Sequence, residues 1–473
     1  MIRRRHLMYA LTGALCLAIP RTADAETLRD AVSAALASHP GIEIAAARKQ
    51  ASTAEEEQAF SNLFPQINTT ATGGRMFGNN STSRGLTVSR GEAYSWLWEG
   101  SASITQPIFN GFETYNRIDA AEARSSAADF TLADAKQGVA LRAAQAFLNV
   151  MRAQEAYAKT SSYQDKIKDY LSRINAMVEG GAADESEAAQ AKNIQSMLEN
   201  TVAEMDGQVK LALADYNEAV GSMPSGELRN DNTQSVLAFK SVDEAVGYAS
   251  GNHPLILSAQ KSLDAEDDEV SADIGSMFPK LDGELSYLKR DQKEEIGGEV
   301  EDGRAVMRLN WGFSTGGGQL AKIRQSKAER SEALARIAQT QREIERDVRR
   351  SYVEYETAMK QRDLAAKRTG VTRDLFHTYE KQFEASKVRL LQLMQAENQL
   401  FTAELEQINA NYRVTMAEYT ALASMGNLVG ALHLDGSAAA AASAPVPEEK
   451  TAGVASQDVY PQTQIEPPPT AGK

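Results

Sequence analysis

Two histidines occupy matching places in this sequence, and histidines are common nitrogen ligands of metal ions. Each begins a motif in which His-Pro is followed, after twenty-three residues, by Phe-Pro: His39-Pro40 with Phe64-Pro65, and His253-Pro254 with Phe278-Pro279. His39 and His253 are 214 residues apart, and His377 lies alone, so the sequence places no third ligand beside either. A role in the turn before a helix-starting proline fits both histidines better than metal binding.

The remaining candidate chemistry does not form a catalytic or cofactor motif. The run Thr315-Gly316-Gly317-Gly318 resembles a phosphate-binding loop, but it lacks the lysine of such a loop, and a hinge is the better interpretation. Acidic clusters at Glu55–Glu57 and Asp264–Glu269 are explained by solvent-exposed helix faces. We therefore predict a protein that is not an enzyme and that binds no cofactor and no metal ion.

Residues 1–25 have the pattern of a cleaved secretory signal peptide. A basic start precedes a short apolar run, and Ala23-Asp24-Ala25 is a small-x-small cleavage site before Glu26. Cys16, the only cysteine, lies within this segment and follows Leu15, whereas a lipoprotein signal has a small residue before its cysteine. We therefore expect a mature chain without a lipid anchor, a disulfide or thiol chemistry.

The composition excludes several classes of protein. The chain has 473 residues, a formal net charge of −14 and only 7% aromatic residues. The acidity argues against a nucleic-acid partner, and many alanines with few aromatic residues suit long, closely packed helices. After residue 25 there is no run of eighteen apolar residues, so no transmembrane helix is predicted. Residues 436–473, rich in Ala, Ser and Pro, are predicted to be disordered.

The sequence between these ends consists of two internal repeats, residues 26–221 and 241–430, joined by a linker at 222–240. Eleven of the forty-five positions from Thr27 to Ala71 recur 214 residues later, and beyond Ile118 the matches recur 205 residues later. Chance supplies isolated matches, but it does not supply this collinear order.

Each repeat predicts a helix hairpin of unusual length. Tracts 112–179 and 319–386 contain no proline and one glycine each in sixty-eight residues, and each would extend about 100 Å as an α-helix. Glycines at about 180–184 mark the first tip, the corresponding segment at about 385–389 is the second tip, and a second helix returns after each.

A period of two replaces the helical period before each long helix. Polar and apolar residues alternate around Trp98–Thr105 and Arg304–Phe313, within predicted β-hairpins at about 66–109 and about 280–314. Strands of about ten residues suit a tilted crossing of a membrane. The expected hairpin loops are Phe77–Tyr94 and Asp291–Gly303.

All three tryptophans, Trp96, Trp98 and Trp311, fall in or beside these strands. Ordinary β-propensity explains them, and so does an aromatic girdle at the membrane interface. The signal peptide and the strand lengths favour the girdle.

Four strands per chain cannot close a membrane barrel, and an open sheet edge in lipid leaves backbone groups unsatisfied. The strands must therefore be shared between chains. The expected fold is mainly α with membrane β: a long antiparallel coiled-coil α-barrel that is continuous with a 12-stranded β-barrel shared by three chains.

The ordered set of these motifs resembles the TolC-like outer-membrane efflux and secretion channels. The resemblance rests on the Ala-Val, His-Pro and Phe-Pro pattern of each repeat, on Thr105–Gly111 and on the tips, and it covers Glu26 to Gly426. It implies a homotrimer in the outer membrane of a Gram-negative bacterium, with a long periplasmic extension and contact with outer-membrane lipid. It also implies a periplasmic adaptor and an inner-membrane ABC or proton-driven transporter as partners in a tripartite efflux pump or type I secretion system.

The resemblance places functional residues at the tips. Members of the family carry two acids that ring the periplasmic aperture, and Gln392 and Gln395 stand at those positions here, with Glu187 at the acid of the first tip. A carboxylate ring attracts cations and glutamines do not, so weak cation selectivity and weak block by multivalent cations are expected. The alternative is that both glutamines only face a neighbouring helix. Arg389 and Lys387 either close the aperture through ion pairs or are solvated charges.

Gly181, Ala182, Ser386 and Lys387 are the predicted contacts for the adaptor, because small residues at exposed tips can interdigitate with a partner. Two other classes compete with a channel. A soluble periplasmic coiled-coil protein would not fractionate with the outer membrane, and a filament of long helices would not stop at a trimer. The cargo is left open, although the absent lipoprotein signal and the two repeats lean toward relatives that secrete polypeptides or serve several transporters.

Overall fold

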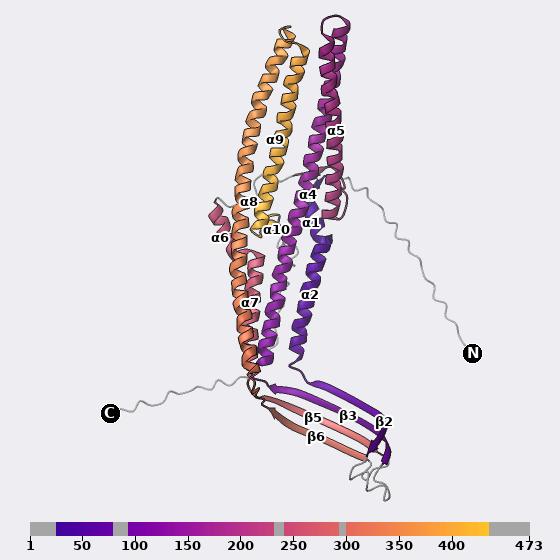
Figure 1. Cartoon of the computed structure of the whole chain (residues 1–473), viewed down its shortest axis with the longest axis vertical. Helices are drawn as coiled ribbons and strands as arrows, with labels where there is room; N and C mark the ends of the chain where they lie inside the picture. The colour runs from indigo at the N-terminus through magenta and orange to yellow at the C-terminus, as the bar shows by residue number, and fades with distance from the viewer. Residues whose placement is uncertain (1–24, 79–92, 231–240, 293–298, 435–473) are drawn as a thin grey trace, which may run out of the picture. The chain divides into compact units, whose positions relative to one another are not determined.

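The computed structural model describes residues 25–78, 93–230, 241–292 and 299–434, and the structural statements below concern these residues (Figure 1). The predicted tail, the predicted signal peptide apart from Ala25, and residues 79–92 and 293–298 of the hairpin loops lie outside them.

The helices of the two halves correspond closely. The first half contains α1 (Leu28–Ser38), α2 (Pro40–Ser61), α4 (Glu113–Glu179) and α5 (Glu185–Val220). The second half contains α6 (Val242–Asn252), α7 (Pro254–Gly275), α8 (Gly318–Glu384), α9 (Leu390–Ser424) and the short α10 (Leu428–Ala431). The bounds of α8 lie 205 residues after those of α4, and both helices have 67 residues, or about 100 Å.

A capping histidine and a proline begin α2 and α7. The Gly41 N–H donates to His39 Nδ1 at 3.0 Å, and the Leu255 N–H donates to His253 Nδ1 at 3.2 Å. Proline is suited to the first helical position because its missing N–H has no partner there in any case. Burial lowers the pKa of the His253 imidazole, which keeps Nδ1 able to accept this hydrogen bond. The predicted helix-starting role of both histidines is confirmed.

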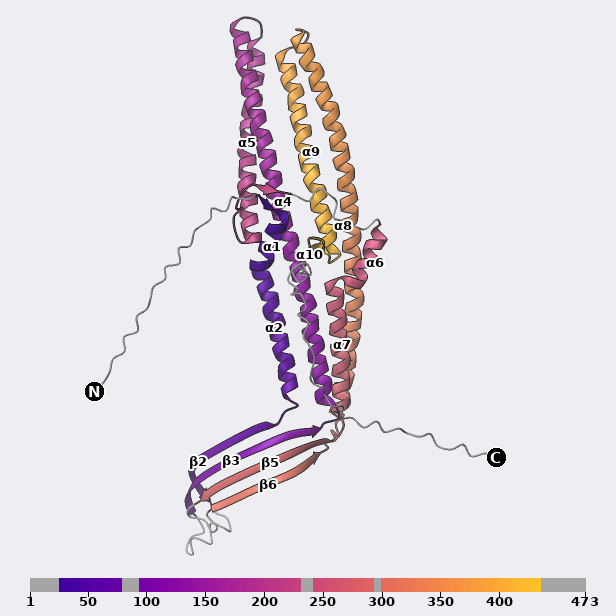
Figure 2. The same cartoon turned by 180° about the vertical axis from the view of Figure 1, so that it is seen from behind.

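The four long strands form one antiparallel sheet with the order β2-β3-β5-β6 (Figure 2). They are β2 (Gln66–Gly78), β3 (Ala93–Phe109), β5 (Lys280–Gln292) and β6 (Glu299–Asn310). The pairing of β3 with β5 joins the two halves, and β2 and β6 are the edges of the sheet.

The structure corrects the predicted second hairpin. β6 ends at Asn310, whereas the alternation predicted a strand through Phe313, and Gly303 lies inside β6 and not in the loop. The reason is the register: Lys280, the first residue of β5, pairs with Asn310, so the ladder holds no partner for Trp311.

α4 lies at the centre of the helical layer. It packs against α2, α5, α7 and α9, whereas α8 packs against α6, α7 and α9. The buried side of α4 is rich in alanine, and Ala140, Ala143 and Ala144 are fully buried, so the neighbouring helices approach closely. In the part of the chain that the structure describes, no helix combines the length and the apolar character needed to cross a membrane.

The junction between β3 and α4 depends on two glycines. Gly111 has a φ of +69°, and a Cβ built on it would lie 2.2 Å from the carbonyl oxygen of Gly275, the last residue of α7. A Cβ on Gly275 would lie 2.5 Å from the carbonyl oxygen of Gly111. The two backbones therefore touch here, whereas the equivalent Gly316 has open space around its Cβ position.

Part of the predicted linker is ordered against the start of the first half. β1 (Glu26–Thr27) pairs in parallel with β4 (Leu228–Arg229). The Glu26 carboxylate accepts hydrogen bonds from the Ser225 N–H at 2.8 Å and from the Tyr216 hydroxyl. The first residues of the predicted mature chain are thus held beside the segment that joins the halves.

Candidate functional site

Both helix hairpins close with the same backbone turn. After α4, Gly181 has a φ of +71°, and the N–H of Ala182 donates to a carbonyl five residues earlier at 2.7 Å. After α8, Ser386 has a φ of +56°, and the N–H of Lys387 donates to a carbonyl five residues earlier at 2.8 Å. This is the Schellman motif, which satisfies the last carbonyls of a helix. All four predicted adaptor contacts lie in these turns and are exposed.

Arg389, which precedes α9, joins the two tips. Its guanidinium donates to the Glu187 carboxylate and lies 3.4 Å from the Asp184 carboxylate at the start of α5. Glu187 is only 6% exposed, so this pair covers a carboxylate that was predicted to line the aperture. The tips lie at the same end of the helices in both views (Figures 1 and 2).

The two predicted aperture glutamines lie on the first turns of α9. Gln392 Oε1 accepts a hydrogen bond from the Arg389 backbone N–H at 3.1 Å, which caps the helix. Gln395 follows three residues later, and both residues are exposed. A role for Gln392, Gln395, Arg389 and Glu187 in a periplasmic aperture concerns an assembly of several chains, and it stays a prediction.

Beyond the tips, α4 and α9 are joined by two ion-paired glutamates. Lys166 Nζ lies 2.7 Å from Glu397 Oε1, and Glu404 lies between Lys159 and Arg373, with Arg373 at 2.9 Å. Burial raises the pKa of the Glu404 carboxyl, but the two cations outweigh burial, and the pKa is lowered. These pairs connect the α4–α5 hairpin to the α8–α9 hairpin.

An apolar cluster surrounds these ion pairs between α4 and α9. The ring of Tyr163 on α4 stacks on Phe401 of α9 with 4.2 Å between ring centroids, and its hydroxyl donates to Asn398 at 3.2 Å. Ile167 and Met394 are fully buried beside this pair. Burial of these side chains stabilises the contact between the hairpins more than the partly exposed ion pairs do.

The sequence predictions missed Asp184, Glu397 and Glu404. One signal was present in the sequence: Glu397 lies on the apolar side of α9, three residues after Met394 and three before Leu400. A lone acid on an apolar helix face points to a buried partner. The identity of that partner required the packing of α4 on α9.

The sheet has one mostly apolar face and one polar face, because residues that pair directly in an antiparallel sheet point to the same side. The apolar face carries Ile67, Trp98, Ala102, Ile104, Leu285, Tyr287, Ala305, Met307 and Leu309. On the polar face, Arg290 donates to Glu99 at 2.6 Å, and Arg308 lies 2.6 Å from Glu284. Such a sheet suits lipid on one side and water on the other.

The tryptophans lie at opposite ends of this sheet. Trp96 and Trp98 lie in β3 toward the loops, and Trp311 follows β6 at the helical end, where its Nε1–H donates to the Met277 carbonyl at 3.1 Å. Trp98 pairs with Asp291, and Asp291 pairs with Glu299, so Trp98 and Glu299 lie at the same height in the sheet. Trp311 follows Glu299 by twelve residues. This separation is roughly 40 Å along a strand and roughly 30 Å across a membrane at the usual tilt. All three are more than half exposed, at 52%, 60% and 58%. The aromatic girdle stays a prediction, in which Trp96 and Trp98 would lie at one membrane interface and Trp311 at the other.

Comparison with known sequences decides the family. The family model described as outer membrane efflux protein matches residues 31–222 and 246–427, most of the described chain. The chain belongs to the outer membrane efflux protein family. This efflux-family chain is 25% identical over 351 residues to the outer membrane efflux protein BepC of Brucella suis, an alignment that covers 72% of the chain and 75% of BepC.

Solved structures share the fold of this efflux-family member. The Campylobacter jejuni CmeC outer membrane channel matches with a TM-score of 0.69 at 16% identity, over 85% of this chain and 86% of CmeC. The Neisseria gonorrhoeae MtrE outer membrane channel, solved in an open state, matches with a TM-score of 0.70 at 14% identity, over 85% and 89%. The predicted resemblance and the predicted TolC-like fold class are confirmed.

Proposed function

We propose that three copies of this chain form a channel-tunnel in the outer membrane of a Gram-negative bacterium, which serves as the passive exit duct of a tripartite efflux pump or a type I secretion system. The four-stranded sheet carries this proposal. It has an apolar face and two edges, β2 and β6, and the described chain supplies no further strand to either edge. In lipid, each unsatisfied backbone group costs several kcal/mol, so the edges require partners.

Pairing β6 of one copy with β2 of the next is antiparallel, because the four strands alternate in direction. Two copies would give eight strands, and side chains fill a barrel of that size. Three copies would give twelve strands and leave room for a duct. We therefore favour the homotrimer.

The helices support the same ring. Leu148 of α4 is fully buried, whereas Val353, 205 residues later on α8, is 56% exposed, and Val371 of α8 is 71% exposed. The side of α8 that carries Val353 and Val371 is therefore exposed in the described chain. α4, in contrast, is packed not only by α2 and α5 of its own half but also by α7 and α9 of the other half. Exposed apolar residues also lie on the opposite edge of the layer, at Ile44 of α2 and Leu211 of α5. Packing α8 of one copy against α2 and α5 of the next would bury both faces.

The tips would contact the partners of the channel. Gly181, Ala182, Ser386 and Lys387 are exposed at the ends of the hairpins, where a periplasmic adaptor can reach them. A passive duct supplies no energy, so an inner-membrane ABC or proton-driven transporter would drive transport. Outer-membrane lipid would contact the apolar face of the sheet and its tryptophans.

Residues near the tips would control the periplasmic aperture. Arg389 would hold the aperture narrow, because its ion pairs with Glu187 and Asp184 keep the hairpins together. Gln392 and Gln395 would line the aperture. Since glutamine carries no charge, we expect weak cation selectivity and weak block by multivalent cations.

The proposal is tested with the full chain extracted from the outer membrane in detergent. We expect a trimeric mass and steady conductance after insertion into planar lipid bilayers. A water-soluble monomer without conductance would overturn the proposal. Cross-linking in intact envelopes, followed by co-purification, would then identify the transporter and separate an efflux pump from a secretion system.

A further inference from the structure

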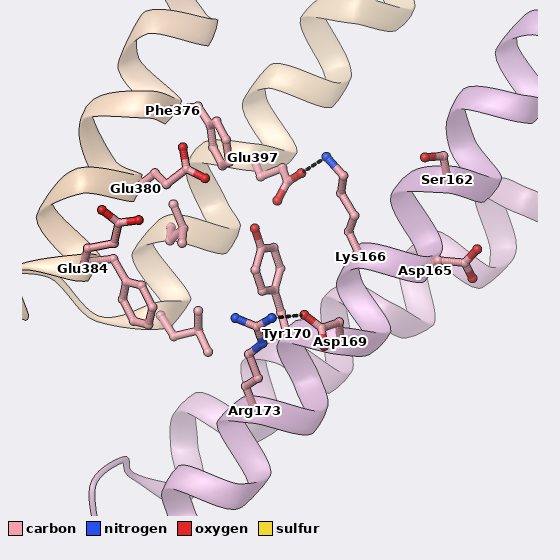
Figure 3. A pocket seen from close by; sticks show the side chains of 13 residues that line it. Ser162, Asp165, Lys166, Asp169, Tyr170, Arg173, Phe376, Glu380, Glu384 and Glu397 are labelled. Carbon is pink, nitrogen blue, oxygen red and sulfur yellow. Dashed lines mark hydrogen bonds and ion pairs between the residues drawn. The ribbon is translucent and has the colours of Figure 1, made fainter.

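A cavity of about 800 Å³ lies between the two hairpins near their tips (Figure 3). Its walls come from α4, from the end of α8 and from the start of α9. Cavities of roughly 300–1,000 Å³ are typical of small-molecule sites. The proposed function assigns this cavity no role.

Glu397 is the unusual residue of the cavity. It is only 3% exposed, and Lys166 lies 2.7 Å from its Oε1. Its Oε2 accepts no hydrogen bond within the described residues, although the Tyr170 hydroxyl points toward the carboxylate (Figure 3). Buried carboxylate oxygens without a hydrogen bond are rare and destabilising, so this atom is an unfilled acceptor.

The cavity is also negatively charged. Each of its cations is paired with an acid of the lining: Lys166 with Glu397, and Arg173 with Asp169 at 2.9 Å. Two further acids, Glu380 and Glu384, line it from α8. A net negative lining favours a cationic occupant.

The electrostatics at Tyr170 agree with this charge. Burial, then a hydrogen bond to the Glu397 carboxylate, and then the negative charges of Glu397 and Glu380 raise the pKa of the Tyr170 hydroxyl.

Apolar side chains complete the cavity. Phe376 and Phe383 of α8 and Leu390 and Leu393 of α9 form its wall beside the carboxylates. An occupant with a positive charge at one end and an apolar body at the other would satisfy both parts of the lining.

We propose that this cavity binds an organic cation with an apolar body, an aryl- or alkylammonium, whose ammonium group lies beside Glu397 and Glu380 and whose body packs on Phe376 and Phe383. The ammonium group supplies the donor that Glu397 Oε2 lacks. Because α4 belongs to one hairpin and α8 and α9 belong to the other, the bound cation contacts both hairpins. It therefore stabilises the arrangement of the hairpins described here.

Calorimetric titration of the full-length detergent-solubilised protein with phenylbutylammonium tests the proposal, and phenylbutanol is the uncharged control. We expect the ammonium to bind about tenfold more tightly than the alcohol, as charge-assisted hydrogen bonds require. Glu397→Gln removes the charge and keeps the shape, so it should abolish this difference while affinity for the alcohol is unchanged.

A second variant guards against misfolding of the first. Glu380 and Glu384 are exposed, and the double change Glu380→Gln with Glu384→Gln should weaken ammonium binding about threefold without affecting the fold. Glu406→Gln changes a carboxylate that pairs with Arg368 within the α8–α9 hairpin, outside this cavity, and should leave binding as in wild type.

Absence of ammonium binding overturns the inference, and so does binding that all three variants leave unchanged. Binding to dissociated monomers but not to the assembled protein also overturns it, because a neighbouring copy would then fill the cavity. Conductance without the ammonium reports on the proposed function separately, so failure of one is distinguished from failure of the other.

Discussion

The α4–α5 and α8–α9 hairpins begin with helices of equal length and close with the same turn, yet they contribute opposite charges to the contact between them. The first tip supplies Asp184 and Glu187, and the second supplies Arg389. At the position equivalent to Glu187, the second hairpin has Gln392, which caps its own helix. The contact therefore forms between unlike hairpins. A repeated backbone sets the geometry, and a few side chains decide which surfaces meet.

The two junctions between strand and long helix test how far the halves are equivalent, and they give the largest expected effect. Gly111→Ala places a Cβ against the Gly275 carbonyl and gives alanine a positive φ, so we expect a loss of about 3 kcal/mol in the free energy of unfolding. Gly316→Ala meets open space in the single chain and should cost less than about 1 kcal/mol. Denaturation in detergent, followed by circular dichroism, measures both, and equal losses would contradict the difference.

The opposite charges at the tips are tested by removing Arg389. Arg389→Ala leaves Glu187 without its cation and loosens the contact between the tips, so we expect a severalfold rise in the open probability of the channel in planar bilayers. Lys387→Ala is the matched control, because Lys387 lies in the same turn and is exposed. A similar rise in both variants would show that the net charge of the tip, and not the ion pair, holds the hairpins together.

Because Glu404 links the two hairpins through ion pairs, the stability of their contact should decrease as the pH falls. Burial is outweighed by Lys159 and Arg373, so the pKa of Glu404 in the folded chain lies below its ordinary value of 4.5. As the pH falls below 4.5, the Glu404 carboxyl is protonated in the unfolded chain at a higher pH than in the folded chain. The stabilisation is therefore complete above this pH and is lost as the pH falls through the folded-state pKa.

Thermal unfolding as a function of pH measures this effect. We expect Glu404→Gln to lower the unfolding temperature at neutral pH and to reduce its fall in acid. Glu406→Gln is the control, because Glu406 pairs with Arg368 within one hairpin and does not join the two. If Glu406→Gln changed the fall of the unfolding temperature in acid as much as Glu404→Gln does, a special role for the contact between the hairpins would be refuted.

The smallest effect is expected at the turns. Ser386→Gly places glycine at a positive φ and should raise the free energy of unfolding by about 0.5–1 kcal/mol. Gly181→Ser, the reverse change at the equivalent position, should lower it by about 1 kcal/mol. The same denaturation measurement applies. Changes of the same sign would show that the two turns differ in more than this residue.

Local signals in the sequence were sufficient for the helices. The prolines after His39 and His253 and the glycines of the first tip predicted where helices start and end, because the conformations of these residues are restricted or unusual, and the repeat placed the second tip. The strand β6 was placed wrongly because its end depends on pairing with Lys280, which lies in another strand.

The candidate site was predicted only in part. Glu187 was selected from a resemblance and Arg389 from its charge at the tip, but their contact with each other was not predicted, because the ion pair joins helices about two hundred residues apart in the sequence. Glu397 was missed for the same reason, since its partner Lys166 belongs to the other hairpin. Contacts within one helix can be predicted from spacing, whereas these depend on how two helices rotate against each other.

The pairing of β3 with β5 has a consequence for assembly. It joins the two halves of one polypeptide in the way that β6 and β2 would join successive copies in the proposed trimer. A cylinder made from six separate half-length chains would need five encounters, each with a loss of translational and rotational entropy. Covalent connection of the halves reduces the encounters to two, so closure becomes possible at a lower concentration of protein in the membrane.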